Sequence, residues 1–144
     1  MCLFEPTKIS PLKEDITVYK VLKVPAEYDG IDPEHIVYQS PYNPKDWHLG
    51  ERYSEDKEEQ VESEIKRFSS ATVGLIHCFK GLQDALNDKF FHEIDAFHSG
   101  EIGDRYVIAE FVIPKDSKYV YSGTFCYCED CYGSSDVIFK KVLL

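Results

Sequence analysis

Residues 106–113, YVIAEFVI, constrain the fold more than any other stretch of this chain. The run is rich in Val, Ile, Tyr and Phe and is too short for an independent helix, which is typical of a strand covered on both faces. Pro114 ends the run, because the fixed backbone angle of proline suits the second position of a turn. A second short run follows at 118–121. The sequence therefore predicts a buried strand, a tight turn and a partner strand.

Strand patterns recur elsewhere along the chain. Residues 16–22, ITVYKVL, alternate in polarity, with Val18 and Leu22 on one face and the charged Lys20 on that same apolar face. Shorter strand patterns lie at 35–39, 74–79 and 136–143. Since the last strands follow one another with short connections, we expect an antiparallel or mixed sheet.

The segment after Ser54 predicts an exposed helix. Ser54 can cap a helix, and acidic residues in a first turn interact favourably with the helix dipole. Only a narrow stripe of Val61, Ile65 and Phe68 is apolar, so most of this helix should face water. The acidic run at 51–64 is therefore interpreted as a solvated face.

A second, amphipathic helix is predicted over residues 82–97. We expect it to pack on the more apolar face of the strand at 106–113, the face that carries Val107 and Phe111. The chain is long enough for one core. The expected fold is a single α+β domain over residues 1–144, with a mixed or mainly antiparallel sheet and one or two helices packed on a face.

Composition narrows the classes of function. The formal net charge of −10 disfavours nucleic-acid binding, which depends on clustered Lys and Arg. No stretch approaches the roughly 18 to 20 consecutive apolar residues that cross a bilayer, and the N-terminus has no signal-peptide pattern. Five cysteines, an odd number, are expected to be thiols in a chain of this size. We therefore expect a cytoplasmic protein that does not bind membranes, and the sequence leaves its oligomeric state open.

Four short stretches of the chain stand out in combination. They are VYKVL at 18–22, SPY at 40–42, Gly74 with His77 and Phe79, and the segment 113–125, which begins with IPK and ends with GTF. Together they resemble a group of small, uncharacterised bacterial and phage proteins, and the resemblance spans most of the chain. It implies a single domain and no particular activity. The chain departs from the group in its acidic run at 51–64, in the segment between Phe90 and Arg105, and in its C-terminal cysteines.

The densest chemical feature is a cysteine cluster near the C-terminus. Cys128 and Cys131 have the separation found in zinc knuckles, and Cys126 is a candidate third ligand. A structural zinc site normally has four ligands, so Cys78 or His77 would have to supply the fourth. We favour a loop of ordinary thiols with no metal or other cofactor, and keep zinc binding and a redox disulfide as alternatives.

Three residues are candidates for catalysis. His77 lies at a strand end directly ahead of a helix, a common place for a ligand site. Glu110 interrupts the most apolar strand, and burial raises the proton affinity of a carboxylate toward values useful in acid–base chemistry. Tyr19 completes the set for an enzyme that acts on a nucleotide-like substrate, with a layout like that of ADP-ribosyl-transferring folds. The structural alternatives are a hydrogen-bonded histidine and, for Glu110, solvent exposure or an ion pair with Lys20.

Aromatic residues in the proline-rich segment form the last candidate site. Tyr42, Trp47 and Tyr53, together with His77, are candidates to line a pocket for a flat ligand, although such aromatic residues more often pack in the core. The sequence has no Gly-rich phosphate loop and none of the familiar catalytic motifs. Our preferred hypothesis is a module that binds an unknown small molecule or protein. The alternatives are the enzyme described above and a zinc-stabilised interaction domain.

Overall fold

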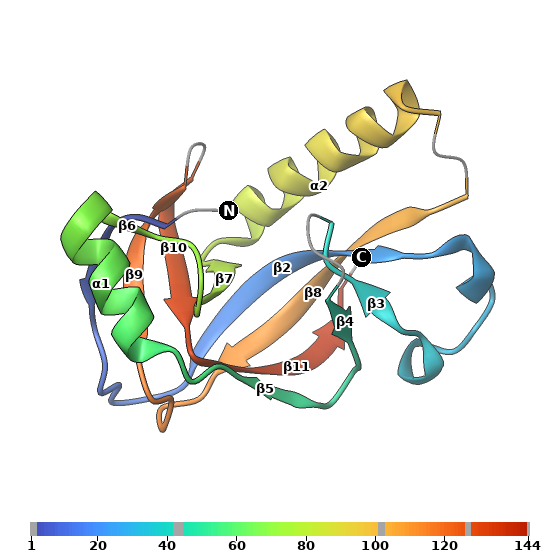
Figure 1. Cartoon of the computed structure of the whole chain (residues 1–144). Helices are drawn as coiled ribbons and strands as arrows, with labels where there is room; N and C mark the ends of the chain where they lie inside the picture. Colours follow the sequence, from blue (N-terminus) through green and yellow to red (C-terminus); the bar gives the residue numbers. More distant parts are fainter. Residues whose placement is uncertain (1–2, 42–44, 101–102, 126–127, 144) are drawn as a thin grey trace.

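The computed structural model describes residues 3–41, 45–100, 103–125 and 128–143, with the backbone alone at 128 and 129. A strongly curled sheet of eleven strands forms its centre, and two α-helices pack against it (Figure 1). Every strand pairing among these residues is antiparallel. The sheet-dominated α+β class is confirmed, and the sheet is antiparallel rather than mixed.

Nine strands follow one another across the curled sheet. Their order is β5 (Arg52–Ser54), β11 (Asp136–Val142), β8 (Arg105–Ile113), β2 (Ile16–Val24), β7 (Ile76–Phe79), β10 (Cys128–Ser134), β9 (Val120–Phe125), β1 (Leu3–Lys8) and β6 (Ser70–Ala71). A short branch beside β2 consists of β3 (Tyr38–Gln39) and β4 (Asp46–Trp47). The helices are α1 (Glu58–Phe68) and α2 (Leu82–His98), and 3-10 turns lie at Ala26–Tyr28 and Pro33–His35.

β8 is the buried strand that the sequence predicts, but its expected partner is wrong. Ile108, Ala109 and Phe111 are fully buried. After the turn at Pro114 the chain enters β9, which pairs with β10 and β1 instead of returning along β8. β2 and β11 already occupy the two edges of β8, so no edge is left for β9.

The two faces of the sheet carry separate apolar cores. The first core contains Val18 and Leu22 of β2, as their alternation predicts, together with Phe111 and Phe139, whose rings stack at 4.7 Å. The second core gathers Leu3, Val61, Ala85, Ile108, Tyr119 and Tyr121 from both helices and several strands. Because alternate residues of a strand point to opposite faces, β8 contributes to both cores.

α2 packs on the face of β8 opposite to the one we expected. Ala85 joins the core of Ile108, and the His92 ring stacks on Tyr106 with 5.4 Å between ring centroids. The expected face, that of Val107 and Phe111, is instead filled by aromatic side chains from β4 and β11. The prediction was therefore wrong about the face, and correct that the helix covers this part of the sheet (Figure 1).

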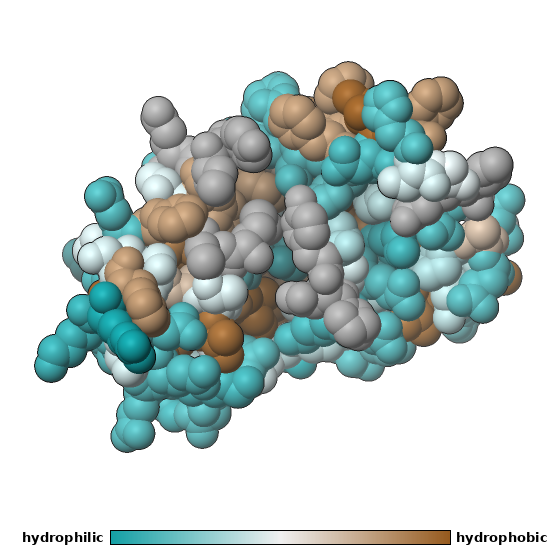
Figure 2. Space-filling model, turned by 45° about the horizontal axis from the view of Figure 1, so that its top comes forward, coloured by the Kyte–Doolittle hydropathy of each residue, from teal (hydrophilic) through white to brown (hydrophobic). Residues whose placement is uncertain are grey.

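Several large apolar side chains of α2 nevertheless face outward. Phe90, Phe91 and Phe97 are 61%, 54% and 82% exposed, and Leu82 is also exposed, whereas the buried side of the helix is Ala85, His92 and Ala96. Apolar side chains are visible over this helix in the upper right of Figure 2. We call Leu82, Phe90, Phe91 and Phe97 the α2 apolar face. In the described part of the chain, neither helix has the length and hydropathy needed to span a membrane.

α1 is the exposed helix expected from the acidic run, but it begins later than predicted. Val61 is fully buried, while Phe68 at the end of the helix is 63% exposed. Lys57 holds the N-cap position and makes no capping hydrogen bond with its side chain. Ser54 ends β5 instead, and its hydroxyl donates to the carboxylate of Asp136. Pairing of β5 with β11 therefore prevails over the local capping preference of Ser54.

Candidate functional site

A cleft of about 370 Å³ opens where β2 and β7 separate. The two strands pair at a single position, Tyr19 with Phe79. Beside this pair, the cleft is lined by residues from β2, from β7 and the loop before it, from α2, and from the segment around β4. Its volume lies within the range of small-molecule sites in proteins.

Lys20 is the central charged group of the cleft. It extends from the apolar face of β2, as the sequence predicts, and its Nζ donates a hydrogen bond to the backbone carbonyl of His77 at 2.5 Å. Among the residues that the structure describes, no carboxylate forms an ion pair with this ammonium. Burial lowers the pKa of Lys20, and the nearby ammonium of Lys45 lowers it further.

Trp47 forms the aromatic wall of the cleft. The Nζ atoms of Lys20 and Lys45 lie 5.5 and 4.7 Å from its ring centroid, within the range of cation–π contacts. The indole nitrogen donates to the Ser40 hydroxyl at 2.7 Å, and Tyr53 packs edge-on against the ring at 4.6 Å. Trp47 is only 1% exposed and belongs to the first core, so it closes one side of the cleft and leaves little ring surface free. This matches core packing, the alternative that the sequence left open for the aromatic residues, and Tyr53 is not among the described residues that line the cleft.

His77 also lines the cleft, in a form that does not suit proton transfer. Burial lowers its pKa to about 3, so the ring is neutral near pH 7. Its Nε2 lies 3.4 Å from the Ala71 carbonyl oxygen, to which the ring N–H donates. This environment matches the hydrogen-bonded structural histidine that the sequence left open as an alternative.

Tyr19 and Glu110 are not brought together with His77 in the cleft. They are cross-strand partners on β2 and β8, and neither is among the described residues that line the cleft. Glu110 interacts with Lys141 at 3.9 Å, which agrees with the structural ion pair kept as an alternative, although the partner is Lys141 and not Lys20. Lys20 lies opposite Ala109 in the register and therefore projects from the other face of the sheet.

The predicted cysteine ligands do not form one site among the described residues. Cys128 and Cys131 belong to β10 and Cys78 to β7, and Cys126 lies outside the described residues. Residues 128–134 form β10, paired on both edges, where we expected a loop of thiols. Cys131 is buried in the second core, whereas Cys78 is buried in the first core on the opposite face, so Cys78 cannot complete a site with Cys131. Burial raises the pKa of the Cys78 thiol to about 11.

Two other candidate positions lie outside the described residues, the side chain of Cys128 and the whole of Tyr42. Within the described part of the chain, acidic and histidine side chains are close enough to share an ion at one place, Asp32, Glu34 and His35, and all three are exposed. Exposed acidic groups of this kind are common without a metal, so we assign no site to them.

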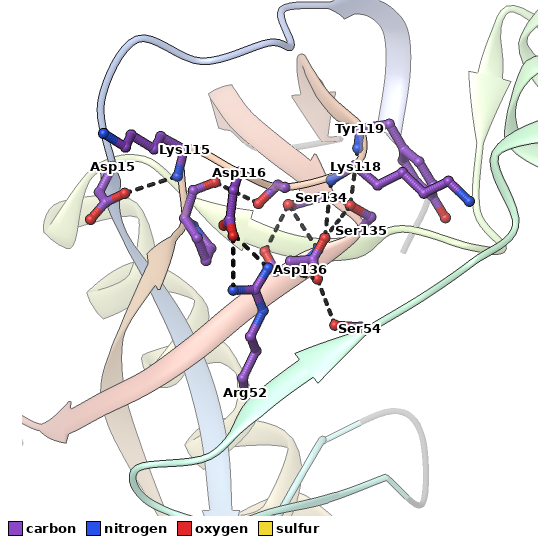
Figure 3. Close-up of polar contacts among 12 residues, drawn as sticks. Asp15, Arg52, Ser54, Lys115, Asp116, Lys118, Tyr119, Ser134, Ser135 and Asp136 are labelled. Atoms are coloured by element: carbon purple, nitrogen blue, oxygen red, sulfur yellow. Dashed lines mark hydrogen bonds and ion pairs between the residues drawn. The ribbon is translucent and has the colours of Figure 1, made fainter.

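A second buried charge, Asp136 at the start of β11, was not predicted. Its carboxylate accepts hydrogen bonds from the hydroxyls of Ser54 and Ser135 at 2.5 and 2.6 Å. It also accepts from the Lys118 amide and the Arg52 guanidinium, each at 3.2 Å (Figure 3). We call these five residues the Asp136 cluster.

The Asp136 cluster stabilises the carboxylate as an anion. Burial alone would raise the pKa of Asp136, but the hydrogen bonds from Ser135, Ser54, Lys118 and Arg52 outweigh burial and hold the pKa below its ordinary value. The cluster joins β5, β11 and the segment before β9. Ser134-Ser135-Asp136 ahead of an apolar run was the one local signal of a polar junction at this point.

Comparisons with known proteins add no relative to this description. No protein-family model matches the chain, and neither the curated proteins nor the solved structures give a significant match. The likeness to small bacterial and phage proteins therefore remains a resemblance carried by a few short stretches.

Proposed function

We propose that the chain is a binding module whose small-molecule ligand occupies the cleft beside Trp47 and Lys20. The observation that carries this proposal is an ammonium group that lines an open cleft without a described carboxylate partner. Removing a charge from water without pairing it is costly, and such groups concentrate at functional sites. A ligand that supplies the missing acceptor would recover part of that cost.

The walls of the cleft favour a small ligand that carries one acidic group. Lys20 and Lys45, whose Nζ atoms both lie near the Trp47 ring, offer positive charge. Glu55 and Asp88 also line the cleft, so its total charge is too small to favour a polyanion. A small carboxylate or phosphate therefore fits these walls best.

Thermal-shift measurements on a panel of small carboxylates, small phosphates and nucleotides would test this function. A ligand present at 100 times its dissociation constant adds about 2.7 kcal/mol to the stability of the folded state. We expect at least one compound to stabilise the wild type and Lys140→Met, whose lysine is exposed and outside the cleft, but not Lys20→Met. Stabilisation that survives in Lys20→Met, or a panel with no stabilising compound, would contradict the proposal.

A second candidate function, protein recognition, is favoured by the α2 apolar face. Exposed aromatic residues of one helix form a surface of the kind that binds an amphipathic partner helix. α2 contains Asp84, Asp88, Glu93 and Asp95 but only one lysine, Lys89. The acidic surroundings would repel a second copy of α2, so we propose a partner with apolar anchors flanked by basic residues.

A pair of model peptides would test the second function. One is an amphipathic helix of Leu and Lys, and the other has the same pattern with Glu in place of Lys. By titration calorimetry at physiological salt, we expect the Leu–Lys peptide alone to bind, and the double variant Phe90→Ser, Phe97→Ser to weaken binding by at least about tenfold. Equal binding of both peptides, or no effect of the double variant, would exclude this function.

A further inference from the structure

We propose that Lys20 captures its ligand covalently, by forming an imine with an aldehyde or ketone carbonyl in the cleft. The inference rests on the proposed function, because it names the chemical class of ligand for the same cleft. Its geometric basis is the position of one amine, which reaches an open cleft from the apolar side of β2. A lysine acts as a nucleophile where it is desolvated or placed near another cation, and Lys20 meets both conditions.

Several ionisable groups on the surrounding elements decide the charge of Lys20. They are Lys45 and Glu55 near β4 and β5, His77 and Cys78 of β7, Asp88 and His92 of α2, and Lys57 ahead of α1. Burial is the largest influence and lowers the pKa of Lys20, so a larger share of neutral amine exists at neutral pH than for an exposed lysine. Cys78, the second-largest influence, raises the pKa, Lys45 lowers it, and Asp88 raises it.

The other reactive groups near Lys20 do not compete for a carbonyl. The thiol of Cys78 stays protonated, because burial raises its pKa to about 11. His77 is neutral and uses its ring N–H for the Ala71 carbonyl. The Lys45 ammonium forms an ion pair with Glu55 at 3.6 Å, and Lys57, the third lysine that lines the cleft, is exposed to solvent. Lys20 is thus the amine in this cleft best suited to attack.

The covalent step balances without an oxidant or a reductant. The Lys20 ammonium first loses a proton to Asp88 or Glu55, the two carboxylates that line the cleft. The amine then bonds to the carbonyl carbon, and the carbonyl electron pair moves to oxygen. The two protons of the amine nitrogen end on that oxygen, the carbon–oxygen bond breaks, and water leaves as the carbon–nitrogen double bond forms. One amine and one carbonyl therefore give one imine and one water.

The ligand class follows from the two amines that a bound carbonyl compound would meet. The Lys45 ammonium would attract an acidic substituent, and the carbonyl would then lie beside Lys20. We therefore assign the cleft to aldehydes or ketones that carry a carboxylate or phosphate. Pyridoxal 5′-phosphate has both features and serves here as a chemical probe.

Reductive trapping on the full chain would test this inference. The wild type is treated at pH 7 with less than one equivalent of pyridoxal 5′-phosphate and cyanoborohydride, and the tagged lysines are located by peptide mass spectrometry. We expect Lys20 to carry at least about threefold more tag than exposed Lys13 or Lys140. In Lys45→Met, which removes a neighbouring cation, the excess at Lys20 should shrink, while Lys140→Met should leave it unchanged.

A parallel arm separates failure of the inference from failure of the proposed function. Pyridoxine 5′-phosphate has the same ring and phosphate but no carbonyl, and its thermal shift is measured on the wild type and Lys20→Met. If Lys20 is tagged no more than Lys13 and Lys140, imine formation is overturned. If pyridoxine 5′-phosphate then still stabilises the wild type alone, the binding function stands. If it stabilises neither protein, the cleft fails for this ligand class as well.

Discussion

Asp136 and Lys20 are both charged groups that the sheet withdraws from solvent, and their surroundings differ. The carboxylate of Asp136 accepts four hydrogen bonds from four residues of the Asp136 cluster, and these hold its pKa low. The ammonium of Lys20 donates a hydrogen bond to one backbone carbonyl and lies near the ring of Trp47, and its pKa is also lowered. For an acid a lowered pKa means a stabilised charge, whereas for a base it means a destabilised one. Asp136 therefore has the surroundings of a structural charge, while Lys20 has those of the ligand-binding group that we propose.

Asp136→Ala should have the largest effect on the free energy of unfolding. Removing the carboxylate leaves the Ser135 hydroxyl and the Lys118 amide without this acceptor, and a buried polar group left without its partner typically costs about 1–3 kcal/mol. Urea unfolding at pH 7 measures the change. Asp116→Ala is the matched control, because Asp116 also contacts Arg52 but is 69% exposed, and it should cost less than about 1 kcal/mol. Similar losses for both variants would refute the structural role of Asp136.

The pH dependence of stability should also depend on Asp136. Because folding lowers the pKa of Asp136, its contribution is present above the unfolded value of 3.8 and is lost as the pH falls through the lower folded value. The stability gap between the wild type and Asp136→Asn should therefore narrow below pH 3.8. Urea unfolding at a series of pH values gives this gap, and a gap that stays constant down to pH 2 would contradict the lowered pKa.

Lys20→Met should have a smaller effect, of opposite sign. Methionine fills much of the same space and removes a charge that lacks a carboxylate partner, at the loss of one hydrogen bond. We expect the free energy of unfolding at pH 7 to stay the same or rise by about 1 kcal/mol. A loss of more than about 2 kcal/mol in urea unfolding would show that Lys20 holds the fold together as Asp136 does.

The smallest expected effect is that of Phe97→Ser on stability. Phe97 is 82% exposed on the α2 apolar face, so its replacement should change the free energy of unfolding by no more than about 0.5 kcal/mol. Ala96→Ser, at a buried neighbouring position, is the paired comparison. If Phe97→Ser destabilises the protein more than Ala96→Ser, the outward orientation of this face is wrong.

Local patterns predicted the elements better than their partners. The alternation of β2 placed Lys20 on an apolar face, and the apolar run of β8 marked a buried strand; both follow from residues close in sequence. The face of β8 covered by α2 could not be read locally, because it depends on aromatic side chains from β4 and β11. Trp47 and His77 were named as site residues, but their meeting beside Lys20 depends on how β2 and β7 separate.

The Asp136 cluster shows the same limit more sharply. Its carboxylate contacts residues 82 and 84 positions away in sequence, at Ser54 and Arg52. Each of these residues alone has a more ordinary local interpretation, such as a helix cap for Ser54. Only the pairing of β5 with β11 brings them together. Polar contacts of this range follow from the completed sheet and leave little signal in any one segment.

The most direct test of the account is the pKa of Lys20 itself. Heteronuclear NMR of protein with ¹³C-labelled lysine side chains follows each amine with pH, and Lys20→Met identifies the Lys20 signal by its disappearance. We predict that Lys20 titrates below the ordinary lysine value of 10.5. A midpoint at or above 10.5 would mean that the surroundings stabilise the ammonium, and it would contradict the proposed ligand site.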